Sequence, residues 1–477
     1  MNRAVASLNS AAGIDASRLE RLLDGFEPSF IFQPVDPLPE AEYVDRLRRI
    51  RREATVAGHD VTLVHADGIG WYHVSNSYLR YICDWAREGV LVIPTDEDKP
   101  LTLFSFFSSS VLLPPAGEPL LVEDIWQVGT WGRESYNRPG RMVDRVVAAV
   151  SGFLQDQGFA RAQIGTIGDA TSAGYWNGLK AELPKASFIA AQDIVDRMQR
   201  LRSPAEQRLV RAAAQLADIG TQAAYHVTRP GVTDHEIYAA FTYAQLARGG
   251  ESGDGYQIGI NRWGTACGKP YGHVVRDGDL INLYISATTY RGYNAQIARM
   301  IAVGAITPKQ EEVLEMCVEG VRAAAARVKP GALVSEVANA SFEPYIRRGY
   351  LGSADSRTMP YNWNANEDGS PRLVPRQAVP DEDWERQGRR LTHVYPATLG
   401  PHNPNVGHQV SMPKFTHYNI ASNNHDRLEP GMTFVLHSQW LDPMVAGCNV
   451  GDCYLVTADG AENLSCHTPL EPHRVKL

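Results

Sequence analysis

The sequence predicts an α/β (α+β) protein, with an N-terminal α/β domain followed by a larger C-terminal domain that contains two similar halves. Three observations support this prediction. Short apolar runs alternate with amphipathic stretches along the N-terminal part. Residues 203–206 (SPAE) have the pattern that starts a helix. Residues 229–236 and 329–336 share a turn-and-helix pattern and lie one hundred residues apart.

The first domain is expected over residues 41–200, after an N-terminal arm over residues 1–40 that ends in the proline-rich segment PVDPLPE. A helix is expected at about residues 41–57. Short apolar runs, rich in β-branched residues, predict strands at the following positions. They lie at residues 61–64, 89–94 and 163–168. Strands that alternate with helical patterns indicate a parallel or mixed sheet covered by helices.

The domain boundary has a clear signal. The Ser203 side chain can cap a helix, Pro204 suits its first position, and Glu206 completes a capping box. An apolar stripe at helical spacing follows. It consists of Leu209, Ala212, Ala213, Leu216 and Ile219. We therefore place the linker near residues 199–202 and the second domain over residues 201–477.

The two related segments in the second domain begin with a basic residue, Pro and Gly. Each continues into a predicted helix with a Thr or Ser that can cap it and a Glu in its first turn. An internal repeat explains the spacing, and the chance recurrence of a common turn would also explain it. Residues 352–399 are rich in Pro, Asn, Asp and Arg and are expected to form a long insertion.

Composition excludes several classes of partner. The net charge of −8 argues against nucleic acid or an anionic membrane surface as the main partner. Six cysteines without CxxC spacing indicate reduced thiols. The N-terminal segment has no apolar signal region, and no apolar run approaches the length of about 18 residues that a membrane span needs. We therefore expect a cytoplasmic protein without a secretion signal.

Four segments of the C-terminal half form an ordered set of motifs. They are residues 278–284 (GDLINLY), 290–299 (YRGYNAQIAR), 429–437 (EPGMTFVLH) and 450–460 (VGDCYLVTADG). In order and spacing they resemble the creatinase/aminopeptidase P/prolidase superfamily (M24). With the helix start at Ser203, the resemblance extends from about residue 199 to the C-terminus. It implies a creatinase-like N-terminal domain and a C-terminal pita-bread catalytic domain.

The metal ligands of that superfamily do not carry over. Its metallopeptidases bind two divalent cations through two Asp, one His and two Glu, and a bridging hydroxide is the nucleophile. The resemblance places the two Asp positions on Tyr284 and Gln296, and the two Glu positions on His437 and Gly451. The family's His corresponds to His402. Because divalent cations need carboxylate charge, we expect no metal and no other cofactor.

Two further segments resemble creatinase, a metal-free member of the superfamily. They are residues 83–87 (CDWAR) and 259–261 (GIN). In creatinase the corresponding aromatic residue and Arg enter the partner subunit's site and hold the substrate carboxylate. The resemblance therefore implies a homodimer with shared active sites, in which Trp85 and Arg87 bind substrate. The alternative is a buried Trp85 and a solvated Arg87. Creatinase's two guanidinium-binding Glu correspond to Ala298 and His437, so creatine is not the expected substrate.

These arguments define a candidate pocket. The expected catalytic residues are His402, His437, Tyr284, Gln296 and Cys267. The expected substrate-binding residues are Trp85, Arg87, His408, His273 and Lys414. Histidine moves protons near neutral pH, and a thiolate beside an imidazole is a nucleophile. The alternatives are a neutral core histidine at 408, a small buried apolar residue at Cys267 and a zinc site built from three His.

The resulting hypothesis is a metal-independent, creatinase-like hydrolase. It would cleave a non-peptide C–N bond in a small carboxylate-bearing substrate other than creatine, with one His transferring protons. Tyr284 and Gln296 would hydrogen-bond the reacting group. Two alternatives remain: a lyase or decarboxylase acting on a small carboxylate, and a catalytically inert binding protein of the same fold.

Overall fold

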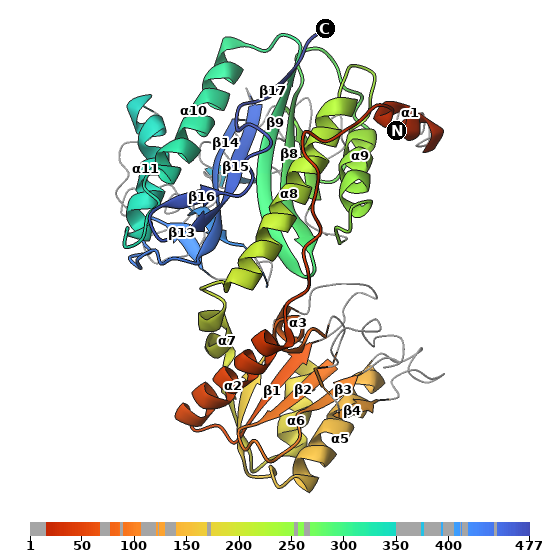
Figure 1. Cartoon of the computed structure of the whole chain (residues 1–477), viewed down its shortest axis with the longest axis vertical. Coiled ribbons are helices and arrows are strands. Elements are labelled where there is room, and N and C mark those ends of the chain that lie inside the picture. Colours follow the sequence, from red (N-terminus) through yellow and green to blue (C-terminus); the bar gives the residue numbers. More distant parts are fainter. Residues whose placement is uncertain are drawn as a thin grey trace. The chain divides into compact units, whose positions relative to one another are not determined.

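The computed structural model describes most of the chain in two compact units. The described residues are 16–66, 77–85, 89–105, 121–122, 124–128, 140–168, 173–251, 256–261, 268–349, 374–375, 393–394, 405–410, 412, 418–442 and 446–477. The N-terminal unit contains Asp36–Arg200 and Met412–Lys414, and the C-terminal unit contains Met1–Val35, Leu201–Ser411 and Phe415–Leu477. Each unit combines helices with a sheet, so the predicted α/β class is confirmed (Figure 1).

The N-terminal unit has a six-stranded mixed sheet in the order β4-β3-β2-β1-β5-β6. Its strands are β1 (Val61–Ala66), β2 (Gly89–Pro94), β3 (Thr102–Ser105), β4 (Asp124–Gln127), β5 (Gln163–Ile167) and β6 (Ser187–Ala190). Its helices are α2 (Glu40–Val56), α3 (Ser77–Cys83), α5 (Gly140–Asp156), α6 (Ala173–Glu182) and α7 (Gln192–Met198). Strand β1 runs antiparallel to β2 and parallel to β5. The first predicted helix is α2, and the three predicted strands are β1, β2 and β5.

The C-terminal unit is built on a nine-stranded sheet in the order β13-β12-β14-β15-β9-β8-β7, with β16 paired to β15 and β17 to β9. Its strands are β7 (Tyr256–Ile260), β8 (Leu280–Tyr290), β9 (Tyr293–Val303), β12 (Asn405–Gln409), β13 (Asn419–Ala421), β14 (Thr433–Asp442), β15 (Ala446–Val456), β16 (Ala461–Asn463) and β17 (His473–Val475). Its helices are α1 (Ala16–Leu23), α8 (Pro204–Val227), α9 (Asp234–Leu246), α10 (Pro308–Ala325) and α11 (Val334–Arg347). Within the predicted insertion, the structure describes one antiparallel pair, β10 (Val374–Pro375) and β11 (His393–Val394).

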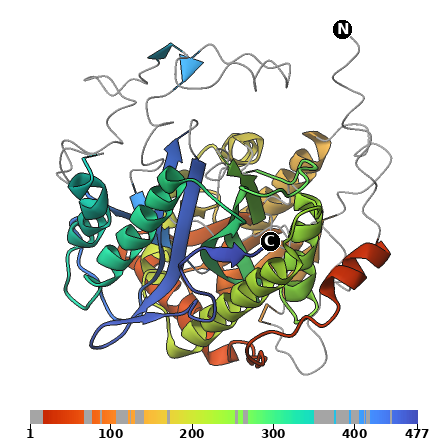
Figure 2. The same cartoon turned by 90° about the horizontal axis from the view of Figure 1, so that it is seen from above.

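Two helix pairs cover two parts of this sheet. Helices α8 and α9 pack on β7, β8 and β9, whereas α10 and α11 pack on the part that contains β12, β14 and β15. Figure 2 shows the two pairs, green and teal, from above. Each pair with its strands has its own cluster of buried apolar side chains. The sheet is therefore covered half by half, as the two related sequence segments suggest.

The helix starts explain why the segments look alike. The predicted capping box forms at Ser203, whose hydroxyl accepts from the Glu206 amide while the Glu206 carboxylate accepts from the Ser203 amide. Thr233 caps α9 in the same way. Glycines 231 and 331 both adopt a positive φ in the turn before the helix. The predicted Ser cap of the second segment is wrong, because α11 begins at Val334 and Ser335 therefore lies inside its first turn.

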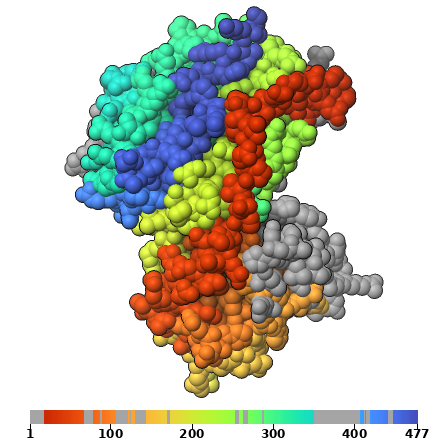
Figure 3. All heavy atoms as spheres, in the orientation of Figure 1, coloured from red at the N-terminus to blue at the C-terminus, as the bar shows by residue number. Residues whose placement is uncertain are grey.

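Residues 16–35 lie on the surface of the C-terminal unit, where Figure 3 shows them in red. Arg18 donates to the carbonyl oxygen of Gly231 at 2.8 Å, and the amide of Ser29 donates to Gln222 at 2.8 Å. The ring of Phe30 stacks on His467. Within the described residues, none of the helices combines the length and the apolar character that crossing a membrane requires.

Candidate active site

Four adjacent strands of the C-terminal sheet carry the candidate residues. They lie in the order β14-β15-β9-β8. The register places Tyr284 opposite Ala298, Ala298 opposite Gly451, and Gly451 opposite His437. Directly paired residues of neighbouring strands point to the same face of a sheet. The family resemblance placed four metal-ligand positions on this chain. Three of them, Tyr284, His437 and Gly451, therefore lie in one row across the sheet. The fourth, Gln296, lies two residues from Ala298 on β9.

Tyr284 and Gln296 are joined directly. The Nε2 of Gln296 donates a hydrogen bond to the Tyr284 hydroxyl at 2.6 Å. Gln296 is 1% exposed, and its Oε1 has no hydrogen-bond partner within the residues that the structure describes. The Tyr284 ring meets the His437 ring edge to face, with 6.4 Å between centroids. The two rings therefore approach each other across Ala298 and Gly451.

His437 is a neutral hydrogen-bond donor. Its Nδ1 lies 2.9 Å from the Nε2 of Gln439, which can only donate, so the imidazole proton is on Nε2 of His437. Burial, and to a lesser extent the neighbouring His408, lower the pKa of His437 to about 3. At neutral pH the ring is therefore uncharged and offers an N–H from Nε2.

His408 has the opposite tautomer. It lies on β12 opposite Val435, which puts it on the same face as His437, and the two ring centroids are 5.7 Å apart. Its Nδ1 lies 3.0 Å from the carbonyl oxygen of Gln409, which can only accept, so Nδ1 carries the proton and Nε2 is the acceptor. Burial also lowers the pKa of His408. One imidazole thus donates and its neighbour accepts.

We call this set of side chains the neutral polar face. It consists of Tyr284, Gln296, His408, His437 and Gln439. Its members are a phenol, two amides and two imidazoles, without a carboxylate. The acid nearest in sequence, Asp452, follows Gly451 on β15 and therefore points to the opposite face. There it pairs with the buried Arg299 at 2.6 Å.

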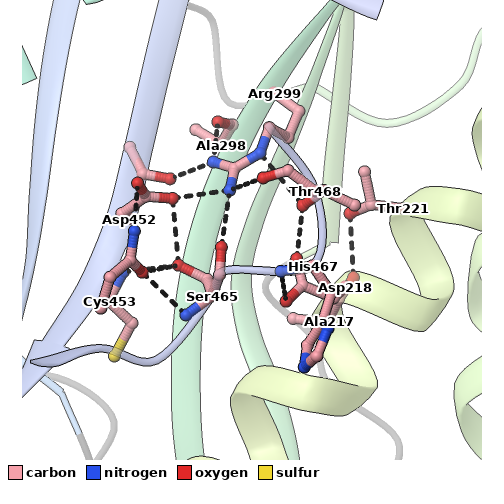
Figure 4. A network of polar contacts seen from close by, with 12 residues as sticks. Ala217, Asp218, Thr221, Ala298, Arg299, Asp452, Cys453, Ser465, His467 and Thr468 are labelled. Atoms are coloured by element: carbon pink, nitrogen blue, oxygen red, sulfur yellow. Dashed lines mark hydrogen bonds and ion pairs between the residues drawn. The ribbon is translucent and has the colours of Figure 1, made fainter. Parts of the chain in front are cut away.

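Arg299 holds the backbone beneath the face. Its guanidinium donates to the carbonyl oxygens of Gly451 at 2.6 Å and Ala298 at 3.0 Å, and its side chain is fully buried. Figure 4 shows these bonds together with those to Asp452 and Thr468. Burial raises the pKa of Asp218, which accepts from Thr468 in the same network. Arg299 thereby fixes the two small residues that lie between the Tyr284 and His437 rings.

Of the other predicted residues, the structure describes Trp85 and His273. Trp85 is buried in the N-terminal unit. Arg87, Cys267, His402 and Lys414 lie outside the described residues. His273 bonds to Asp279 at 2.7 Å. Asp279 also accepts from Asn261 of the GIN segment, so this motif ties the end of β7 to the start of β8.

Sequence reasoning missed three amide residues on the same face of the sheet. Gln439 lies two residues after His437 on β14, Asn449 pairs with Gln439 from β15, and Gln257 pairs with Tyr284 from β7. Amides at these positions belong to none of the motifs. The period-two alternation around His437 was the available signal, because it places Val435, His437 and Gln439 on one face.

Residues 208–458 match metallopeptidase family M24. The chain belongs to this family. An uncharacterized hydrolase/peptidase of Sinorhizobium fredii is 36% identical over 184 residues, covering 37% of this chain and 46% of that protein. An Xaa-Pro dipeptidase of Lactobacillus helveticus is 22% identical over 304 residues, covering 63% and 69%. This M24 protein thus spans less than half the length of the first of these relatives.

Solved structures agree on the fold. The Xaa-Pro dipeptidase from Bacillus anthracis is similar with a TM-score of 0.65 and 18% identity, covering 91% of this chain and 100% of that one. The prolidase from Pyrococcus horikoshii has a TM-score of 0.64 and 17% identity, covering 88% and 98%. The predicted pita-bread fold, with an N-terminal domain before the M24 domain, is confirmed.

The comparisons correct the predicted reaction. The relatives are named Xaa-Pro dipeptidases and peptidases, which contradicts the prediction of a hydrolase for non-peptide C–N bonds. That prediction depended on two short segments, residues 83–87 and 259–261, that resemble creatinase. The match to the metallopeptidases extends over residues 208–458 and outweighs them.

The residues present do not fit the two metal ions that the family implies. Hard or borderline divalent cations are held by carboxylates and imidazoles, and the aligned positions carry a phenol, an amide, an imidazole and no side chain. A Cβ added to Gly451 would lie 2.7 Å from the Cβ of His437 and 2.8 Å from the Leu436 oxygen. No side chain can therefore be accommodated there without movement of β14. Among the described residues, no group of three or more His, Cys, Asp or Glu could hold a metal ion.

Proposed function

We propose that this M24 protein is a hydrolase that cleaves peptide bonds in small, carboxylate-bearing substrates at the neutral polar face, without a bound metal. Membership in the peptidase family and the names of its relatives support the reaction class. One observation carries the metal-free proposal: two adjacent neutral imidazoles have opposite tautomers, one a donor and one an acceptor. We further propose that the protein belongs to a metal-free branch of the family and acts in the cytoplasm.

The tautomers assign a role to each ring. Nε2 of His408 accepts a proton from a water molecule, whose oxygen attacks the carbonyl carbon of the peptide bond. The N–H of His437 donates to the carbonyl oxygen as negative charge develops there, since a fixed donor stabilises an oxyanion. His408 then gives its proton to the leaving nitrogen, the C–N bond breaks, and an acid and an amine result. The lowered pKa of His408 favours this second transfer.

Hydrolysis of a dipeptide panel, Xaa-Pro and Xaa-Ala, tests the proposal on the full chain. We expect turnover that survives EDTA and 1,10-phenanthroline, with metal content well below one equivalent per chain. His437→Leu should lower kcat/KM by about 100-fold, because leucine has no N–H to donate to the oxyanion. The exposed His425→Gln is the control and should retain wild-type rates.

Two results would contradict it. Activity that disappears with chelator and returns with Mn²⁺ would show that a metal is required. Dipeptides that bind but are never cleaved would show that the face recognises peptides without hydrolysing them.

We also retain the homodimer with shared sites as a proposal, supported by the resemblance of residues 83–87 to creatinase. Arg87→Ala and His437→Ala chains, each inactive alone, should regain part of the activity when mixed under conditions of subunit exchange. One site of each heterodimer would then contain both residues. Activity that stays absent in a mixture shown by mass spectrometry to contain heterodimers would place each site within one chain.

A further inference from the structure

Buried amide oxygens without partners lie on the same face of the sheet as the proposed site. Among the described residues, Oε1 of Gln296 and Oδ1 of Asn449 have no hydrogen-bond partner, and these two residues are 1% and 2% exposed. Oε1 of Gln257, a residue that is only half-buried, also has no partner in the described part of the chain. Buried polar groups are normally paired, and an orphaned one costs about 1–3 kcal/mol. These oxygens therefore have unused capacity to accept hydrogen bonds from a bound molecule.

The register places the two deeply buried acceptors around one point. Gly451 pairs with Ala298 at the centre of the row. Gln296 lies two residues from Ala298 along β9, and Asn449 lies two residues from Gly451 along β15. Because β9 and β15 are antiparallel, these steps lead to opposite sides of the Ala298–Gly451 pair. A molecule bound over this pair has an acceptor on either side and the His437 donor beside it.

Because the neutral polar face carries no charge, it favours some kinds of bound hydrogen-bond donor over others. A cation bound here would have no carboxylate among the face residues to offset its desolvation, which costs several kcal/mol. A carboxylate group would bring further lone pairs against the amide oxygens. An uncharged amide avoids both costs, since its N–H donates to an amide oxygen while its carbonyl accepts from Nε2 of His437.

We propose that Gln296 and Asn449 determine specificity, and that they select an uncharged amide whose nitrogen carries a hydrogen. The inference rests on the proposed function only in placing the substrate on this face. The nitrogen of an Xaa-Pro bond carries no hydrogen and cannot make this contact. The chain should therefore favour Xaa-Ala over Xaa-Pro peptides, unlike the relatives named as Xaa-Pro dipeptidases.

Two ligands that differ in one N–H test this directly. N-acetylalanine N-methylamide and N-acetylalanine N,N-dimethylamide would be titrated into the full chain, with dissociation constants measured by NMR. The first should bind about tenfold more tightly, because the second leaves an amide oxygen unpaired. Gln296→Met removes the acceptor at the same length and should reduce this preference. Gln296→Glu keeps an acceptor there and should preserve it. Asn449→Leu is an independent second variant and should also reduce it.

Equal affinities in the wild-type chain would overturn the inference. So would a preference that persists in both Gln296→Met and Asn449→Leu. Neither ligand needs to be cleaved, so the result is independent of the proposed hydrolysis. Tighter binding of the N-methylamide together with uncleaved dipeptides would support the inference and contradict the proposed function.

Discussion

Replacing Arg299 by Met is expected to destabilise the C-terminal unit by about 3–5 kcal/mol, because a buried charge partner is lost. Arg299 is fully buried and bonds to Asp452 at 2.6 Å. Without it the Asp452 carboxylate stays buried with its main counter-charge gone. The carbonyl oxygens of Gly451 and Ala298 lose a donor as well.

An exposed ion pair serves as the control, because it separates the effect of burial from the effect of the ion pair itself. Arg211 makes a two-bond contact with Glu462, at 2.8 and 2.6 Å, but both side chains are more than a third exposed. Arg211→Met should cost no more than about 1 kcal/mol, as exposed pairs do. Urea unfolding followed by tryptophan fluorescence measures both variants. Equal losses for the two would mean that the buried network contributes no more than a surface pair.

His437 should make the protein sensitive to acid. Burial lowers its pKa to about 3 from 6.5, so the folded state favours the neutral ring. Its stabilising contribution is complete above pH 6.5 and is lost as the pH falls toward 3, because the unfolded chain then binds the extra proton. The loss is about 1.4 kcal/mol per pH unit, or roughly 3 kcal/mol by about pH 4.5.

Unfolding free energies at about pH 7.5 and about pH 4.5 give the measurement. His437→Gln should lose less stability between these two values than the wild-type chain does. His65, whose pKa burial also lowers to about 3, contributes in the N-terminal unit of both proteins and cancels in the comparison. The exposed His425→Gln should follow the wild-type curve. An unchanged acid loss in His437→Gln would mean that folding does not lower the pKa of His437.

Much of the fold follows from local patterns in the sequence. The capping box at Ser203 forms as predicted because its three residues need only one another. Strands β1 and β2 are buried at every position and consist mainly of apolar residues, so burial on both faces is encoded in each run alone. The predicted cap at Ser335 does not form, because α11 begins at Val334, two residues before the start that a Ser335 cap would give.

The site was predictable in part. The order of the motifs places Tyr284, Gln296 and His437 on neighbouring strands, and the structure joins them. The tautomers depend on Gln439 and on the Gln409 carbonyl, which are contacts that no motif contains. The partner of Asp452 depends on the register between β9 and β15, which a single sequence does not specify. A buried oxygen without a hydrogen-bond partner, such as Oδ1 of Asn449, can be recognised only when the positions of all its neighbours are known.

The close fit between Gly451 and His437 also constrains how this sequence can change over generations. Any residue larger than Gly at 451 meets the His437 Cβ and the Leu436 oxygen, so Gly451→Glu alone would strain the strand pair. Changing His437→Glu first would bury a carboxylate with no cation beside it. Each of these two substitutions is thus unfavourable on its own. Every residue except Gly has a Cβ at position 437, so a change there does not make room at 451. The backbone of β14 itself would have to shift before a side chain at 451 could fit.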